Sequence, residues 1–144
     1  MILDNRALFS DAQAITATTV STNSYDLGQP GISMPGRVQL LRSMGKGKVI
    51  PFVCVIDQTF NNLTSLAIVM QEASDSAFTT PVEVFRINVP LAQLVKGYVL
   101  PMDKLPRGIN LQYLQMRYEV TGTAPTQGTI TAGIVAAVDA SYQG

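Results

Sequence analysis

A chain of 144 residues has the length of one ordinary domain, and it can bury about 68–70% of the surface that its unfolded form exposes. Hydrophobic residues make up 47% of the chain and charged residues 14%, a composition that excludes an intrinsically disordered protein. The ten basic and ten acidic residues cancel, so the net charge gives no drive to bind nucleic acid or an anionic membrane.

The N-terminal segment is too short to form an independent helix or strand, although several of its residues are apolar. It also lacks the basic stretch and apolar run of a secretory signal, which predicts synthesis in a cytoplasm. Residues 1–10 should gain order by packing on something else. Two alternatives stay open: the segment closes the protein's own sandwich, or it is a docking arm that adds a strand to a neighbouring subunit. The candidate contact residues of this arm are Ile2, Leu3, Arg6, Leu8 and Phe9.

Charge is segregated in the next part of the chain. The segment Gly28–Gly36, with three glycines and two prolines, predicts an extended surface loop. Every charged residue between positions 27 and 56 is basic, and every charged residue from 57 to 85 is acidic. We expect the basic group to orient the protein on an acidic partner surface, the alternative being independent solvated side chains. The basic residues are Arg37, Arg42, Lys46 and Lys48, and the acidic residues are Asp57, Glu72, Asp75 and Glu83.

Two continuous apolar runs, Val49–Ile56 and Leu66–Met70, predict strands that are buried on both faces by a second layer or a neighbouring subunit. The first is the longest apolar run, far short of the roughly 20 residues that span a bilayer. Pro51 lacks an amide hydrogen and places this run at a sheet edge or a strand start. An apolar edge needs a cover, and another protein is one candidate. Cys54 is expected to be a buried small hydrophobe, with no disulfide partner and no paired zinc ligands.

Val82–Val89 is predicted to be a strand whose apolar alternation changes phase between Val84 and Phe85, which indicates a bulge. Before it, Asp75 is expected to cap a turn between strands. After it, Pro90–Lys96 is the best helix candidate, at most a turn or two, with Pro90 at the first helical position.

The last two predicted strands lie at the C-terminal end of the sequence. Ile109–Val120 changes phase in its middle, which predicts a second bulge near Tyr113 and Leu114. Thr129–Asp139 alternates cleanly, and its apolar face should enter the core.

Together these runs predict about eight strands separated by Gly, Pro, Asn, Asp and Ser. We therefore expect a single all-β domain over residues 1–144, an antiparallel jelly-roll β-sandwich with minimal helix. Another β-sandwich topology is the main alternative.

The chemistry of an enzyme is missing. The chain has no histidine, the most common general base at neutral pH, and no Gly-rich loop with the spacing that binds phosphate. The carboxylates are scattered, which leaves a glycosidase pair assembled in space as a weak alternative. We expect no enzyme activity, no catalytic residue, no cofactor and no metal. A carbohydrate-binding β-sandwich module is a competing hypothesis, although the chain has no tryptophan for a sugar platform.

Two stretches carry a resemblance to a known family. Phe60, Asn61, Asn62, Leu63, Thr64, Ser65 and Leu66, followed by Ile68, Met70 and Ala73 to Val82, resemble a strand-turn-strand unit in small capsid proteins of tailed phages. The opening residues Met1 to Ser10 are similar to the start of the same proteins. The chain thus resembles the jelly-roll cement (decoration) proteins of short-tailed bacteriophages, such as that of a Bordetella phage.

This resemblance implies a structural protein on the outer capsid surface of the virion, made in the host bacterial cytoplasm. It implies the major capsid protein as partner, with neighbouring subunits joined noncovalently, and self-association as a homodimer, with a trimer as the alternative. Neither nucleic acid nor a membrane is expected as a partner. Another virion role, as a head-tail or tail component, stays open.

Overall fold

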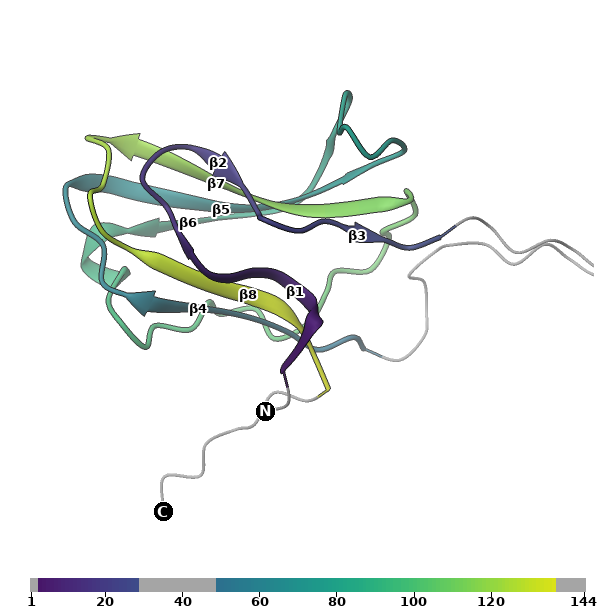
Figure 1. Cartoon of the computed structure of the whole chain (residues 1–144), viewed down its shortest axis with the longest axis horizontal. Coiled ribbons are helices and arrows are strands. Elements are labelled where there is room, and N and C mark those ends of the chain that lie inside the picture. The colour runs from purple at the N-terminus through teal and green to yellow at the C-terminus, as the bar shows by residue number, and fades with distance from the viewer. Residues whose placement is uncertain (1–2, 29–48, 137–144) are drawn as a thin grey trace, which may run out of the picture.

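The computed structural model describes residues 3–28 and 49–136 of the chain. Over these residues it forms eight strands in two antiparallel sheets that lie face to face as two layers (Figure 1). The predicted all-β sandwich is therefore confirmed. The strands are β1 (Leu3–Ala14), β2 (Thr19–Val20), β3 (Tyr25–Asp26), β4 (Phe52–Gln58), β5 (Leu63–Ala73), β6 (Val82–Pro90), β7 (Tyr113–Gly122) and β8 (Thr129–Val135).

One sheet has the strand order β1-β8-β4, and the other has the order β2-β7-β5-β6 with β3 also paired to β7. Residues 97–105 run along the remaining edge of β4. Five backbone hydrogen bonds of 2.8–3.0 Å join the two segments: Gly97 N to Ile56 O, Ile56 N to Tyr98 O, Leu100 N to Cys54 O, Phe52 N to Asp103 O and Leu105 N to Ile50 O. With this segment as the partner of β4, the pairings β1 to β8, β2 and β3 to β7, and β5 to β6 follow the scheme of a jelly roll.

The edge of β4 is thus covered by the protein's own chain. Pro51 stands directly before β4 and forms an isolated bridge with Lys104, which confirms its predicted place at a strand start. Because residues 97–105 satisfy the backbone groups of this apolar strand, β4 needs no second protein to pair with it.

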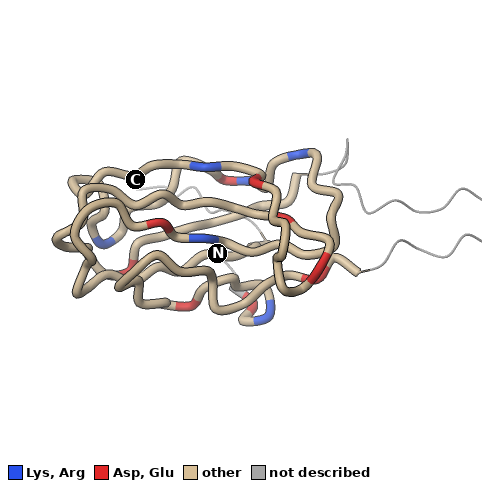
Figure 2. Tube along the Cα trace, turned by 90° about the horizontal axis from the view of Figure 1, so that it is seen from above, with Lys and Arg blue, Asp and Glu red and all other residues tan. Residues whose placement is uncertain are grey.

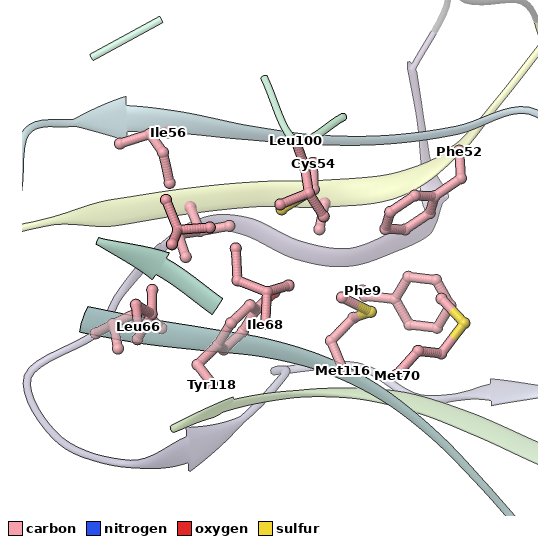
Figure 3. Close-up of a cluster of buried hydrophobic side chains, with 14 of the residues drawn as sticks. Phe9, Phe52, Cys54, Ile56, Leu66, Ile68, Met70, Leu100, Met116 and Tyr118 are labelled. Carbon is pink, nitrogen blue, oxygen red and sulfur yellow. The ribbon is translucent and has the colours of Figure 1, made fainter. Parts of the chain in front are cut away.

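The core lies between the two sheets and follows the period-two alternation of strand side chains. Figure 3 shows residues of β4 facing residues of β5 and β7 across it, with the ring of Phe9 from β1 among them. Phe9 is 0% exposed, and its ring centroid lies 6.4 Å from that of Phe52 in an edge-on contact. The labelled side chains from β4, β5 and β7 are Phe52, Cys54, Ile56, Leu66, Ile68, Met70, Met116 and Tyr118.

The two predicted bulges have different outcomes. The bulge in β6 is confirmed, because Met70 pairs with Phe85 and Gln71 with Glu83, which leaves Val84 as the extra residue. The prediction of a bulge near Tyr113 and Leu114 is wrong, because β7 begins at Tyr113 and pairs with β5 in an unbroken register up to Thr121. The phase change there marks the start of the strand, where the backbone enters the sheet from residues 109–112.

The predicted helix is shorter than expected. A 3-10 turn spans Leu91–Gln93, and Pro90 is its N-cap, one position before the predicted place. In the last strand, Ile130 and Ala132 are buried in the core as predicted, and Ile134 packs against it. This strand ends at Val135 rather than at Asp139, since Ala136 already lies in a bend and later residues are outside the described part.

A buried carboxylate ties the start of β7 to the end of β5. Glu72 Oε2 accepts hydrogen bonds from the backbone amides of Asn110 and Leu111 at 2.9 and 3.0 Å, and Glu72 is 7% exposed. We expect Glu72→Ala to lower the free energy of unfolding by about 1–3 kcal/mol, because two amides lose their acceptor. Urea denaturation measures the loss. The control Glu83→Ala removes an exposed paired carboxylate and should cost about 0–1 kcal/mol; equal losses would contradict the prediction.

Candidate interaction surfaces

The groups in the core lack the features of reactive side chains. Cys54 is buried, and desolvation, together with the nearby charge of Asp57, raises the pKa of its thiol to about 12. The thiol is therefore protonated at neutral pH and is a weak nucleophile. Burial also raises the pKa of Tyr118, whose hydroxyl lies 2.7 Å from that of Ser10. Within residues 3–28 and 49–136, no three His, Cys, Asp or Glu side chains come together as metal ligands.

The outer face of the β2-β7-β5-β6 sheet holds a network of paired charges. Arg86 on β6 binds both carboxylate oxygens of Glu83 at 3.0 Å, and its Nη1 lies 2.7 Å from Glu119 Oε2 on β7. The hydrogen bond from Arg86 lowers the pKa of Glu119. Arg117 Nε lies 3.0 Å from Glu119 Oε1 without the alignment of a hydrogen bond, so that contact is an ion pair only.

This network covers an apolar position in the middle of the sheet. Val69 on β5 pairs with Arg86 on one side and Arg117 on the other, and it is 0% exposed. The stems of the two arginines can cover a neighbouring apolar side chain while their charged ends stay in water. The charges on this face are therefore already satisfied within the protein.

The outer face of the β1-β8-β4 sheet has a different character. Phe52, Cys54 and Ile56 of β4 point into the core, so the alternate residues Val53 and Val55 lie on the outer face. Leu8 lies on the same face over Gly133, where a Cβ atom would meet its side chain. These aliphatic side chains are largely buried, since Leu8 is 6% and Val53 is 3% exposed, whereas the paired charges on the other sheet reach solvent.

The predicted arm residues fall into three groups. Leu8 and Phe9 are buried in β1, which pairs with β8 of the protein's own sandwich. Arg6 is exposed on the same strand, and Leu3 begins it. Ile2 and the basic group Arg37, Arg42, Lys46 and Lys48 lie outside the described residues.

The predicted acidic group has no common free face. Glu83 is paired with Arg86, and Glu72 is buried. Asp75 accepts hydrogen bonds from the hydroxyl and the amide of Thr79, which lower its pKa and confirm its predicted role as a turn cap. Asp57 accepts a hydrogen bond from Thr131 at 2.6 Å. Figure 2 likewise shows acidic and basic residues interspersed along the described chain.

A sugar-binding platform also lacks its usual residues in the part of the chain that the structure describes. There every Phe and Tyr is buried or half-buried. Phe78, in the turn after β5, stacks edge-on against Tyr113 with ring centroids 6.5 Å apart. The aromatic rings are thus used for packing within the protein, which disfavours the flat exposed platform of a carbohydrate-binding module.

Sequence reasoning missed residues 95–107, which place exposed valines and basic side chains beside β4. Val95 and Val99 are exposed large hydrophobics, and Lys96, Lys104 and Arg107 are exposed cations. The local signal was weak, because this stretch contains two prolines and alternates with no regular period.

No described helix is long and apolar enough to cross a lipid bilayer.

The described residues form an antiparallel all-β sandwich. Comparison with known families places it more closely. The family model Bbp16, named for a capsid-associated Bordetella phage protein, matches residues 9–138. The chain belongs to the Bbp16 family, and membership indicates a phage structural protein. No curated protein matches the chain.

Proposed function

We propose that the protein is a capsid cement (decoration) protein that binds the outer surface of a phage head. It stabilises the shell by joining neighbouring major capsid protein subunits. The observation that carries this proposal is the match to the Bbp16 family over residues 9–138. The fold supports it, because a sandwich with a closed core and two broad sheet faces presents extended surface for contacts.

The mechanism we propose is avidity across a repeating lattice. Each copy makes modest contacts to two or more shell subunits, and separating those subunits then requires many contacts to break together. The partners are the major capsid protein and a second copy of this chain, with a dimer preferred and a trimer as the alternative. The basic group at 37–48 and Arg6 stay candidate contacts for this docking.

Heads assembled without the protein should rupture at lower temperature and at lower internal pressure than decorated heads. Adding back the purified protein should restore both thresholds, since its contacts span adjacent subunits. Calorimetry and osmotic-shock release of packaged DNA measure the two thresholds. Unchanged thresholds in its absence would contradict the cement role, and a particle reconstruction with the protein at the portal or tail would favour the head-tail alternative.

A further inference from the structure

The region beside β4 combines exposed apolar and basic side chains on one part of the surface. Val99 pairs with Val55, which lies on the outer face of β4, and Lys104 pairs with Pro51 further along the strand. Residues opposite each other in an antiparallel pair share a face, so Val99 and Lys104 point outward from the sheet. Val99 is 50% exposed, and Val49, two residues before Pro51, is 55% exposed. We name Val49, Val55, Val99 and Lys104, with the neighbouring Lys96 and Arg107, the β4 patch.

The patch extends along β4 and mixes apolar with basic side chains. From Val49 to Val55 the chain advances about 20 Å, at about 3.3 Å per residue. Val55 and Val99 lie opposite each other, Lys104 lies opposite Pro51 between Val49 and Val55 along the strand, and Lys96 and Arg107 flank the segment that covers β4. Protein-protein contact surfaces combine apolar side chains with polar and charged ones, as this patch does.

The cations of the patch also differ from those on the other sheet. Arg86 and Arg117 are both held by carboxylates of the same sheet face. Lys96, Lys104 and Arg107 make no side-chain hydrogen bond or ion pair with another described residue, and Asp103 is the one acidic residue among them. The patch therefore presents unsatisfied positive charge around apolar side chains.

We propose that the β4 patch is the surface that docks on the phage head, and that its partner is an acidic, partly apolar surface formed by the shell protein. This proposal rests on the proposed cement function and names the face that serves it. The positive charge of the patch would orient the protein and speed its encounter with an acidic surface. The valines would supply the area removed from water.

Two other occupants fit the patch less well. In a two-fold contact between copies of this chain, two patches with the same net positive charge would face each other, and like charges oppose such a contact. Nucleic acid binds through Lys and Arg contacts to phosphates, which leaves the exposed valines of the patch without a role.

The test measures binding of the full-length protein to purified heads that lack it, by co-sedimentation at several salt concentrations. Val99→Asp should weaken binding about tenfold or more, because the new carboxylate repels an acidic partner and is buried in the contact. Lys104→Glu should weaken binding about tenfold at low salt and reduce its salt dependence. Val82→Asp is the matched control for Val99→Asp, since Val82 is 52% exposed and lies on β6 in the other sheet. Thermal unfolding by circular dichroism verifies that each variant is folded.

Each outcome decides the proposal. The proposal is supported if the wild type binds, both patch variants lose binding, and Val82→Asp keeps it. Equal binding by the wild type and the patch variants would show that the β4 patch is not the docking surface, and would leave the cement function standing. Absence of binding by the wild type would overturn both the docking surface and the cement function. A loss caused by Val82→Asp instead would place the docking surface on the other sheet and overturn the proposal. The assignment of the β4 patch as the docking surface also fails if Val99→Asp changes only the oligomeric state, which would make the patch a contact between copies. It fails likewise if Lys104→Glu abolishes only binding to duplex DNA.

Discussion

Replacing Phe9 by alanine is expected to lower the free energy of unfolding by about 3–5 kcal/mol, the usual cost of removing a fully buried aromatic ring. Phe9 is 0% exposed and lies against Tyr25 and Phe52, with ring centroids 5.7 and 6.4 Å away. Truncation would leave a cavity between β1, β3 and β4 that the rigid sheets cannot close. Equilibrium unfolding in urea, followed by far-ultraviolet circular dichroism, measures the loss.

Asn5→Ala on the same strand is the control, because Asn5 is exposed and its loss should change stability by less than about 0.5 kcal/mol. Deleting residues 1–9 should then leave the protein unable to fold, since it removes Phe9 and much of the pairing of β1 with β8. A truncated protein that folds and loses only its binding to heads would instead make the segment a docking arm.

The two readings of the N-terminal segment illustrate what a sequence can predict. The apolar residues of this segment indicate that it must pack against other protein. The local pattern does not distinguish packing on its own domain from packing on a neighbouring subunit. The register that places Leu8 over Gly133 depends on residues more than a hundred positions apart. The same limit applies to Arg86 and Glu119, whose ion pair arises because β5 lies between their strands.

Features that depend on local alternation were predictable. The core-facing positions of β8, Ile130 and Ala132, follow from its period of two, and the bulge at Val84 follows from a change of phase within a continuous strand. A similar change of phase at Tyr113 has another cause, the entry of the chain into β7. Phase alone does not distinguish a bulge from a strand end, because both reverse the direction of successive side chains.

The cover of β4 could not be predicted from local pattern. Residues 97–105 hold their place through backbone hydrogen bonds to residues that lie 41 to 55 positions earlier in the chain, and backbone groups are the same in every sequence. The apolar residues of β4 indicated that its edge needs a cover. Only the fold shows that residues 97–105 of the same chain supply it. The outward side chains of the covering segment then become a surface of the protein, which is how the β4 patch arises.

Replacing Gly128 by alanine is expected to be among the most destabilising single-methyl changes in the described part of the chain. Gly128 has φ +135°, a conformation that side chains with a Cβ rarely adopt, and an added Cβ would overlap the ring of Phe60. Phe60 is 3% exposed and its backbone amide binds the carbonyl of Leu94 at 3.0 Å, so the ring has little freedom to move away. Backbone strain of about 1–3 kcal/mol and overpacking of about 1–3 kcal/mol should act together.

Gly108→Ala separates these two effects, because Gly108 also has a positive φ, +97°, while nothing lies within 4 Å of its added Cβ. This control should show the backbone cost alone, and Gly128→Ala should exceed it by about 1–3 kcal/mol in urea denaturation. In a Phe60→Leu background the smaller, more flexible side chain can yield, so Gly128→Ala should cost less there than in the wild type. Equal losses of unfolding free energy in Gly108→Ala and Gly128→Ala would contradict this prediction. So would a loss in Gly128→Ala that is the same with Phe or Leu at position 60. Either result would mean that the ring of Phe60 can move away from the added methyl group.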